Sequence, residues 1–419
     1  KEIILFMNKQ KLLEKYKMLE ELTEKEFQNF SKKHPLRNFM ETVEIGNLRK
    51  KNGWTVKYLG LKENKKIIGA TMLLSRKRHF NMNEFYALRG PLLDYSNDNQ
   101  VEVFLKELKD YVKKNNGYCL RIDPYLPIRR YDNDKELEVP KTNIFKILET
   151  LKFKKSETQE QVSSMYVLDL EGKSEDDVLK EMKPNTRNII RKTIKTGIEV
   201  SELTKDELEN FYGIMLETGK RKGFSVRNIF YYENMYDLFS KKKEIKYLVT
   251  RLDLNRYISL LNEEIEENTK KKEALSDSRC NDGKRKSFDE TINSLKKKVD
   301  LAKKQKEEKN SSIITLAGSM FVMTDPEIVY LSSGNYEEYL MYNSQYLIQW
   351  EMIKYAIEHG YKRYNFYGTP TTNKDDKTYG IYQFKASFNG YMEELLGEYV
   401  VATSPVYYLI NLIHKLKKS

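Results

Sequence analysis

A run of basic side chains without an acidic neighbour lies in the stretch "MKPNTRNIIRKTIKTG". Spacings of four place Lys183, Arg187 and Arg191 on one face of a predicted helix, and Lys192 and Lys195 continue the positive charge. A solvated basic face accounts for many runs of this kind. Because no acid neutralises these residues, they equally suit phosphate groups, such as those of an RNA backbone. The run therefore predicts either a charged surface or a phosphate-binding helix.

Two further stretches place a cation beside aromatic side chains. In "GFSVRNIFYYENMY", Arg227 and Tyr231 fall one turn apart if the segment is helical. Such an arginine can bind a phosphate through two N–H groups, and the tyrosine can stack or donate a hydrogen bond. In "TYGIYQFKASFNGYMEELLGEY", Lys385 lies in an apolar strand pattern between Phe384 and Phe388. A lysine there either extends to the surface or places a cation beside an oxyanion that forms during a reaction.

The sequence predicts neither a metal site nor a cofactor site. None of the histidines lies at metal-ligand spacing from another histidine or from a cysteine. They are His34, His79, His359 and His414. Cys119 lies in an apolar strand pattern and Cys280 in a polar loop, so we expect no disulfide and a reducing compartment. The sequence also contains no P-loop and no G-x-G-x-x-G fingerprint.

The charge balance favours an anionic partner. Across 419 residues, 74 Lys and Arg outnumber 62 Asp and Glu, and the formal net charge is +12. Nucleic acid, pyrophosphate and a membrane surface all fit this charge. No apolar run approaches the length of a membrane span, and "KEIILFMNKQ" is too short and too mixed for a signal peptide. We therefore expect a cytoplasmic protein.

The elements that must position these residues occur twice along the chain. "NNGYCLRIDPYLP" and "EHGYKRYNFYGTP" each follow an amphipathic helix pattern, turn at a glycine and enter an aromatic-rich strand. Upstream, "VKYLGL" and "IIGATMLLS" predict a hairpin, and "IKYLVTRL" and "IITLAGSMFV" predict a second one. Because order and spacing agree over several elements, we predict a duplicated α/β unit. The second hairpin carries an insert at roughly 253–310, where the first has a short turn.

The insert predicts an antiparallel two-helix coiled coil. Apolar residues alternate spacings of four and three in two segments separated by the polar stretch "SDSRCNDGKRK". They are Leu254, Ile258, Leu261 and Ile265 in the first segment, and Phe288, Ile292, Leu295, Val299 and Ala302 in the second. Arms of about twenty residues would reach roughly 30 Å. Such an arm acts as a spacer or contacts a large ligand, and both possibilities stay open.

The predicted organisation has two α/β domains, an inserted arm and two terminal segments. The predicted bounds are 1–21 for an N-terminal extension, 22–165 for the first domain, 166–252 with 311–404 for the second, 253–310 for the coiled coil and 405–419 for a C-terminal basic helix. The last segment, "PVYYLINLIHKLKKS", is apolar on one side and basic on the other. It packs against the body of the protein or contacts an anionic membrane.

Several stretches, taken in order, resemble the Fem family of non-ribosomal peptidyltransferases, of the FemA, FemB and FemX type. They are "LRGPLLDYSN", "RIDPYLP", "MYVLDLEGK", the arginine-rich run at 187–192, "YNFYG" and "GIYQFKASFNGYMEELLGEY". The resemblance spans about 22–410. It implies two GNAT-like domains, with mixed sheets and flanking helices, and a coiled-coil arm inserted in the second. It also implies transfer of an aminoacyl group from a charged tRNA to an amine of lipid II or of a bridge already begun, without a cofactor.

The resemblance implies roles for single residues. Lys385 matches the lysine of the family's F-K-x-x-F segment near the transferred acyl group, where we hypothesise that it stabilises the oxyanion, and Phe384 shapes that pocket. Arg227 and Tyr231 match an R-x-x-x-Y pair that holds the acceptor's phosphates. The other candidates are Arg49 and Tyr330 for acceptor binding, Asp123 either for deprotonating the acceptor or for a structural role at a strand end, and Lys183, Arg187, Arg191 and Lys192 for tRNA binding.

Two other functions compete with aminoacyl transfer. A CoA-dependent N-acetyltransferase shares the implied fold but uses a glycine-rich loop for the CoA pyrophosphate, and no R-x-x-G-x-G-like segment occurs here. A non-catalytic protein that binds tRNA or precursor is disfavoured by the joint presence of Lys385, Arg227 and Tyr231. The implied partners also include the inner membrane face and a second Fem-type protein in a homo- or hetero-dimer. The transferred amino acid, whether glycine, serine or alanine, is not evident from these residues.

Overall fold

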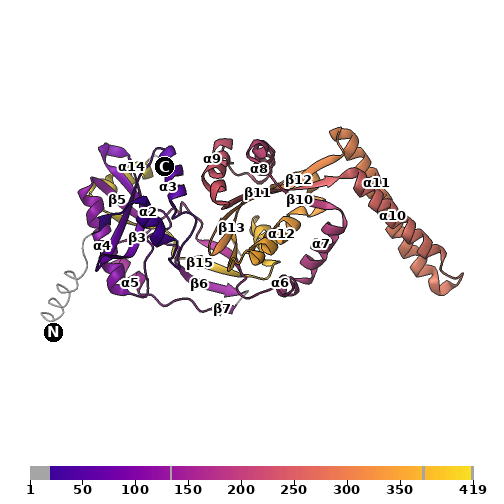
Figure 1. Ribbon diagram of the computed structural model, residues 1–419, viewed down its shortest axis with the longest axis horizontal. Coiled ribbons are helices and arrows are strands. Elements are labelled where there is room, and N and C mark those ends of the chain that lie inside the picture. The colour runs from indigo at the N-terminus through magenta and orange to yellow at the C-terminus, as the bar shows by residue number, and fades with distance from the viewer. Residues whose placement is uncertain (1–18, 133–134, 370–372, 417–419) are drawn as a thin grey trace.

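Two β-sheets with flanking helices form the frame of the computed structural model, which describes residues 19–132, 135–369 and 373–416 (Figure 1). Within these residues the first sheet has seven strands. Their order is β1 (Glu20–Glu21), β2 (Thr55–Glu63), β3 (Lys66–Lys77), β4 (Asn83–Ala87), β5 (Gly117–Ile122), β16 (Tyr399–Ala402) and β8 (Lys154–Lys155). Of the predicted extension 1–21, residues 1–18 lie outside the described residues, and Glu20–Glu21 pairs with β2.

The second sheet has nine strands in the part of the chain that the structure describes. Their order is β10 (Ile198–Glu202), β11 (Ile245–Asp253), β12 (Ile313–Thr324), β13 (Glu327–Asn335), β14 (Arg363–Gly368), β9 (Ser164–Asp169), β15 (Tyr391–Leu395), β6 (Pro127–Asp132) and β7 (Lys135–Leu137).

The same succession of elements recurs in both sheets, as a duplication requires. Helix α4 (Asp98–Lys114) connects β4 to β5, and helix α12 (Ser344–Glu358) connects β13 to β14. In each unit the hairpin and the next strand pair antiparallel, whereas the last two strands pair parallel. A parallel pair needs a long crossover, which the helix provides. The ends of β5 and β14 thus occupy corresponding places in the two halves.

The two halves exchange strands and share an apolar core. β16, late in the chain, pairs with β5 of the first sheet, whereas β6 and β7 from the first half extend the second sheet beyond β15. Strand pairing therefore crosses the boundary expected at residue 165. One buried cluster draws on both halves, and its members include Phe27, Ile45 and Tyr86 from the first and Phe211, Tyr232 and Met320 from the second. This shared core holds the halves in one arrangement.

The remaining helices surround the sheets (Figure 1). They are α2 (Glu24–Ser31), α3 (Val43–Lys51), α5 (Ile144–Thr150), α6 (Glu175–Glu181), α7 (Pro184–Lys195), α8 (Leu208–Lys222), α9 (Ile229–Phe239), α13 (Tyr379–Ala386) and α14 (Val406–Leu416). Short 3₁₀ helices lie at His79–Asn81, Lys205–Glu207, Ser240–Lys242, Arg279–Asn281 and Glu337–Tyr342. None of the helices described is both long and apolar enough to cross a membrane.

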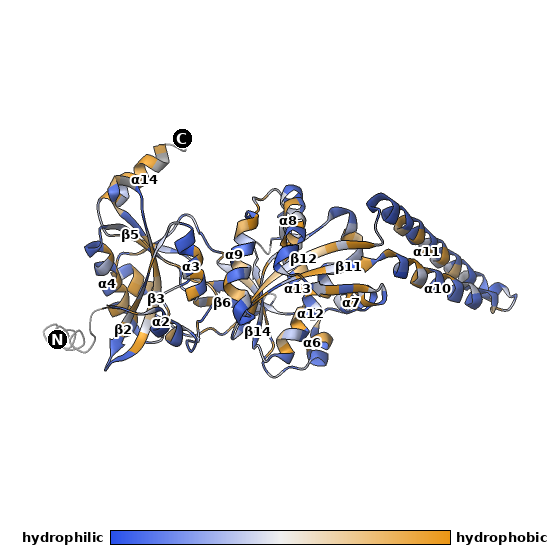
Figure 2. Cartoon of the chain, turned by 45° about the horizontal axis from the view of Figure 1, so that its top comes forward, coloured by the Kyte–Doolittle hydropathy of each residue, from blue (hydrophilic) through white to orange (hydrophobic). Residues whose placement is uncertain are grey.

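The insert forms two helices that extend away from β11 and β12 (Figures 1 and 2). These are α10 (Leu254–Glu273) and α11 (Asp282–Lys309), which lie against each other. Side chains from the predicted apolar seam are buried between them, while Figure 2 shows a largely hydrophilic outer surface. The buried residues of the predicted seam are Leu254, Leu261, Ile292, Leu295, Val299 and Ala302. The helices agree with the predicted segments, and their coiled-coil geometry stays a prediction.

The strand predicted around Lys385 is wrong, because this residue lies in helix α13. Alternating apolar residues over such a short segment fit a strand period, yet the spacing of four between Phe384 and Phe388 also fits a helix. Both rings contact Tyr346 of α12, at centroid distances of 4.9 Å and 5.8 Å. Because both rings pack against the same side chain, they must lie close together, and two residues four apart lie closer together in a helix than in an extended strand.

Candidate active site

Lys385 is a buried cation near the end of strand β14. Its side chain is 5% exposed, and its Nζ donates hydrogen bonds to the carbonyl oxygens of Tyr367, at 3.2 Å, and Gly368. Within the described part of the chain, no carboxylate pairs with it, and burial lowers its pKa to about 7. The ordinary pKa of a lysine, near 10.5, keeps the side chain as ammonium at neutral pH. With a pKa of about 7, Lys385 is present there as both ammonium and amine. Phe384, the preceding residue, is half-buried against Tyr346.

Tyr367 links Lys385 to the first half of the molecule. Its backbone has a φ of +59°, in the left-handed region that non-glycine residues seldom occupy, and its N–H donates to Asn365 Oδ1 at 2.7 Å. The Arg89 guanidinium donates a hydrogen bond to the Tyr367 hydroxyl, whose pKa is raised by burial. Arg89 from the first half and the buried Lys385 from the second therefore both contact Tyr367.

Asp123 lies on the other side of Arg89, directly after strand β5. Arg89 Nη1 donates to Asp123 Oδ1 at 3.1 Å, and the Tyr86 hydroxyl donates to Oδ2 at 3.0 Å. Both charged side chains are almost completely buried. Burial raises the pKa of Asp123 to about 6, against the lowering effect of Arg89. Both carboxylate oxygens are thus occupied within the protein, and a role as general base stays a prediction.

A second buried polar group at the junction was not predicted from the sequence. The Tyr125 hydroxyl donates to Glu327 Oε1 at 2.9 Å, and Asn365 Nδ2 donates to that hydroxyl at 2.9 Å. Burial raises the pKa of the Glu327 carboxyl. These three residues line a small cavity together with Arg89 and Tyr367. Four of the five belong to motifs that carried the family resemblance, whereas Glu327 had no signal in the sequence.

Cations from both halves approach Tyr231. Arg227 precedes helix α9 rather than lying within it, and its guanidinium carbon is 5.7 Å from the Tyr231 ring centroid. Arg227 is exposed, while burial raises the pKa of the half-buried Tyr231 to about 12. Arg49, from helix α3 of the first half, also acts electrostatically on Tyr231. The buried Nε of Arg49 has no hydrogen-bond partner among the described residues. Such a group, near an exposed guanidinium, suits an anionic ligand.

Tyr330 lies in the core of the second half. Its hydroxyl donates to Ser333 Oγ and lies 3.5 Å from Gln345 Oε1, and its ring stacks on Phe321 at 5.6 Å. Burial raises its pKa to about 12. These partners of Tyr330 all belong to the second half. Its role in acceptor binding stays a prediction.

The basic helix α7 begins beside the lysine site. The backbone N–H of Lys183 donates to the carbonyl oxygen of Ser387 at 3.2 Å, two residues after Lys385. Lys183 and Arg191 are exposed, and so is Lys192. Arg187 is different, because its Nη1 donates to the carbonyl oxygens of Lys180 and Met182 and so caps the end of α6. Three of the four predicted tRNA-binding cations therefore remain on the surface.

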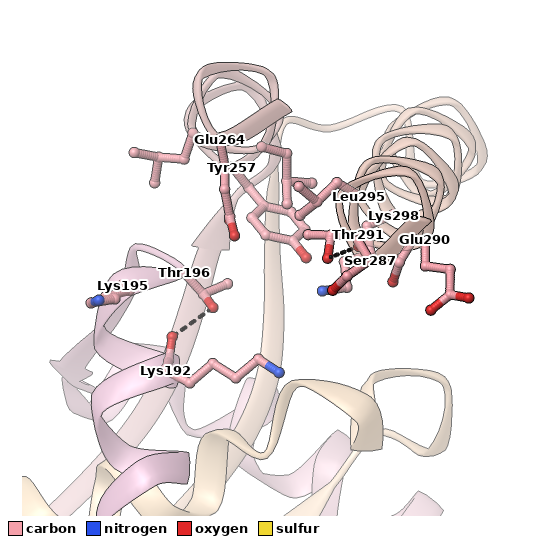
Figure 3. Close-up of a pocket in the computed structure, with 13 residues that line it drawn as sticks. Lys192, Lys195, Thr196, Tyr257, Glu264, Ser287, Glu290, Thr291, Leu295 and Lys298 are labelled. Atoms are coloured by element: carbon pink, nitrogen blue, oxygen red, sulfur yellow. Dashed lines mark hydrogen bonds between the residues drawn. The ribbon is translucent and has the colours of Figure 1, made fainter. Parts of the chain in front are cut away.

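The other end of α7 borders an open crevice at the base of the helical arm (Figure 3). Lys192 and Lys195 line one wall, and Tyr257 of α10 and Lys298 of α11 lie across from them. In Figure 3 the Lys192 side chain extends into the space between α7 and the arm. Helix α7 has 12 residues, a length of about 18 Å, so its exposed cations run from the lysine site to the crevice, where the arm also contributes Glu264 and Glu290.

Comparison with known proteins finds relatives over nearly the whole chain. The sequence model of the FemAB family matches residues 22–415. Aminoacyltransferase FemA from Staphylococcus epidermidis (strain ATCC 12228 / FDA PCI 1200) is 30% identical over 413 residues, covering 95% of this chain and 99% of that protein. Aminoacyltransferase FemA from Staphylococcus aureus (strain MRSA252) is 29% identical over 413 residues, covering 94% and 98%.

A solved structure supports the predicted fold class. The crystal structure of FemX superposes with a TM-score of 0.73 and 25% identity, covering 94% of this chain and 100% of FemX. Together with the repeated strand order in the two sheets, this superposition confirms a mixed α/β fold with two sheets and flanking helices.

Proposed function

Because the chain belongs to the FemAB family, we propose that it transfers an amino acid from aminoacyl-tRNA to an amine of a peptidoglycan precursor. The acceptor is the stem-peptide amine of lipid II or the amine of a bridge already begun. One observation carries the proposal: Lys385 is a buried cation without a carboxylate partner among the described residues, next to the junction of the halves. Its ammonium form is the group that an acyl transfer to an amine requires beside the reacting carbonyl.

The chemistry needs no nucleophile from the protein. An aminoacyl-tRNA ester is already activated, and the acceptor amine attacks its carbonyl carbon to form a new C–N bond. The carbonyl oxygen then carries negative charge, which the Lys385 ammonium stabilises by a hydrogen bond. When the C–O bond of the ester breaks, the proton lost by the amine reaches the ribose oxygen. Holding the two substrates in register supplies much of the remaining rate gain.

Both substrates are polyanions, and distinct basic groups serve each of them. Arg49, Arg227 and Tyr231 bind the acceptor's phosphates, since they bring two guanidinium groups and a phenol together from both halves. The exposed cations of α7 bind the tRNA, whose aminoacyl end reaches Lys385 along this helix. Tyr330 and Phe384 shape the pocket.

Asp123 is proposed as the base that receives the acceptor's proton. The pKa of about 6 that burial causes suits proton transfer near neutral pH. Its two hydrogen bonds to Arg89 and Tyr86 argue for the structural alternative. Substitution by asparagine separates the two roles, because it preserves the shape of the group but removes its basicity.

Contact with the inner membrane face extends the proposal, because the lipid-linked acceptor resides there. Helix α14 exposes Tyr408, Leu412 and Leu416 at spacings of four, while Ile410 packs against the first half. A helix with such a face binds membrane surfaces. Association with a second Fem-type protein, as homo- or hetero-dimer, stays a prediction from the family.

The decisive experiment offers the enzyme two donors. Labelled aminoacyl-tRNA with lipid II, and labelled acetyl-CoA with the same acceptor, are incubated separately with the protein. We expect label on lipid II only from aminoacyl-tRNA. Label only from acetyl-CoA would identify an N-acetyltransferase, and retention of tRNA without transfer would identify a binding protein.

A further inference from the structure

The last residues of α8, the connection that follows them and the first residues of α9 combine positive charge with exposed aromatic rings. Residues 220–230, "KRKGFSVRNIF", contain four cations and no acid, and they are called the basic-aromatic loop below. Phe224 is 46% exposed and Phe230 is 65% exposed. Lys220 and Lys222 are also exposed. Two large exposed rings six residues apart, in a segment with four cations, point to a partner for this loop.

Both ends of the loop are anchored, so its exposed rings are presented by ordered backbone. Helix α8 ends at Gly223, whose φ of +73° lies in the left-handed region, and the Gly223 N–H donates to the Gly219 carbonyl oxygen at 2.8 Å. Asn228 caps α9 by accepting a hydrogen bond from the Tyr231 N–H at 3.1 Å. Tyr232 is buried, whereas Phe230, two residues earlier, points outward.

The loop contains Arg227, which the proposed function assigns to the acceptor's phosphates. Those phosphates are joined to a lipid chain that stays in the bilayer, so the surface around them must face the membrane. In sequence, Arg227 lies between the two exposed rings, which matches a phosphate at the level of lipid headgroups with apolar groups below it. The exposed Lys220 and Lys222 precede it in the same segment and suit anionic headgroups.

We propose that the basic-aromatic loop docks the enzyme on the anionic membrane surface, with Phe224 and Phe230 inserted at the headgroup boundary and Arg227 on the acceptor's phosphates. This inference rests on the proposed function for the identity of the acceptor. The docking also explains why cations and rings occur in one loop. Lysines attract the enzyme to the surface, and the rings hold it at the depth of the phosphates.

Single-stranded RNA is the competing partner, because its bases stack on aromatic rings and its phosphates bind cations. The position of the loop favours lipid. The cations proposed for tRNA lie on or next to α7, which begins beside Lys385, whereas the loop contains Arg227 and adjoins Tyr231. The experiment keeps RNA binding as a separate outcome.

The first test measures membrane binding with a matched control. The double variant F224S/F230S is compared with F145S, which removes a ring that is 51% exposed on α5 of the first half. Co-sedimentation uses vesicles of equal parts phosphatidylglycerol and phosphatidylcholine. We expect the double variant to partition about tenfold more weakly, because two inserted rings are lost, and F145S to equal the unmodified protein. L412S reports the separate contribution of helix α14.

A charge variant tests the second half of the proposal. K220Q/K222Q is expected to weaken partition onto the anionic vesicles severalfold and to leave partition onto phosphatidylcholine alone unchanged. Equal partition of F224S/F230S, F145S and the unmodified protein would overturn the docking role. Reduced tRNA affinity of F224S/F230S with unchanged vesicle partition would assign the loop to RNA instead.

The second test connects docking to transfer. We expect F224S/F230S to lose about tenfold in rate with lipid II in vesicles, but to retain the full rate with a soluble acceptor that carries the same peptide and diphosphate without the polyprenyl chain. An equal loss with both acceptors would contradict docking. If the unmodified protein transfers to neither acceptor, the proposed function fails, while the vesicle measurement still decides the docking role.

Discussion

The ends of the parallel strand pairs hold charge differently in the two halves of the molecule. After β5 in the first half, Arg89 and Asp123 are both buried and neutralise each other at 3.1 Å. At the end of β14 in the second half, the carbonyl oxygens of Tyr367 and Gly368 are the only partners of the Lys385 ammonium among the residues that the structure describes. Corresponding places in a duplicated fold therefore carry a compensated charge pair and an uncompensated cation.

The difference fits a structural role for the ion pair and the catalytic role proposed for the lysine. A buried ion pair is stable only while both partners are present, and each charge mainly interacts with its partner. The positive charge of a buried cation without a counter-ion can instead stabilise negative charge that develops on a substrate. Arg89 also donates to the Tyr367 hydroxyl, so the pair of the first half positions the residue whose carbonyl oxygen binds Lys385. The first half thus helps to position Tyr367, and Tyr367 of the second half binds Lys385.

The largest effect is expected from breaking the compensated pair. Arg89→Leu leaves the Asp123 carboxylate buried without its counter-ion, so we expect the free energy of unfolding to fall by about 3–5 kcal/mol. Denaturant titration followed by circular dichroism measures this loss. Arg129→Leu is the control, since Arg129 is exposed and its pair with Glu394 contributes less than about 1 kcal/mol. Equal stability of the two variants would contradict a supporting role for the pair.

Removing the uncompensated cation should affect the reaction rather than the fold. We expect Lys385→Met to reduce single-turnover transfer about 10²–10³-fold, the usual loss when one oxyanion donor is removed. Acceptor affinity should stay near that of the unmodified protein, and the unfolding midpoint should not fall, because methionine fills the site without a buried charge. Lys362→Met, which changes an exposed lysine that pairs with Glu171, controls for loss of positive charge. Full activity of Lys385→Met would remove the lysine from the mechanism.

A smaller effect is expected where cations of both halves meet. Arg227→Ala should weaken acceptor binding about tenfold through loss of a charged hydrogen bond, without a change in single-turnover rate at saturation. Arg49→Ala should act similarly, and the double variant should lose less than the product of the two effects if both contact one phosphate group. Isothermal titration with the soluble diphosphate acceptor measures the affinities. Additive losses would instead indicate separate contacts.

Local patterns in the sequence predicted most elements but not the contacts between the halves. Period and spacing were enough for both hairpins, for α4 and α12, and for the helices of the insert. The contacts of Tyr125 with Glu327 join residues 202 positions apart, which no local pattern encodes. The same holds for the exchange of β6, β7 and β16 between the sheets.

The sequence predicted which residues belong to the candidate site better than it predicted the elements that carry them and the contacts that they make. Lys385 was identified beside Phe384, yet its helix was predicted as a strand, because a short apolar segment fits both periods. Arg187 was grouped with the exposed cations by spacing alone. Its hydrogen bonds to carbonyl oxygens at the end of α6 depend on how two helices meet, which the spacing does not contain.

The smallest expected effect is the pH dependence of transfer. It tests whether Lys385 differs from the Arg89–Asp123 pair in carrying a charge without a counter-ion. Since burial lowers the pKa of Lys385 to about 7, its ammonium form is lost as pH rises through this value. Single-turnover transfer should therefore decline above about pH 7 once the acceptor amine is deprotonated. Lys385→Arg should remove this decline, because the guanidinium stays protonated, even if its shape lowers the maximal rate.

The same pKa has a consequence for stability with a defined sign. Between about pH 7 and 10.5 the unfolded lysine binds a proton that the folded lysine has released, so the free energy of unfolding rises with pH in this window. Lys385→Met should lack this rise, and the difference between the two proteins should be largest at and below about pH 7. An equal pH dependence of unfolding in both would show that Lys385 titrates normally, and the uncompensated cation would then cease to differ from an ordinary surface lysine.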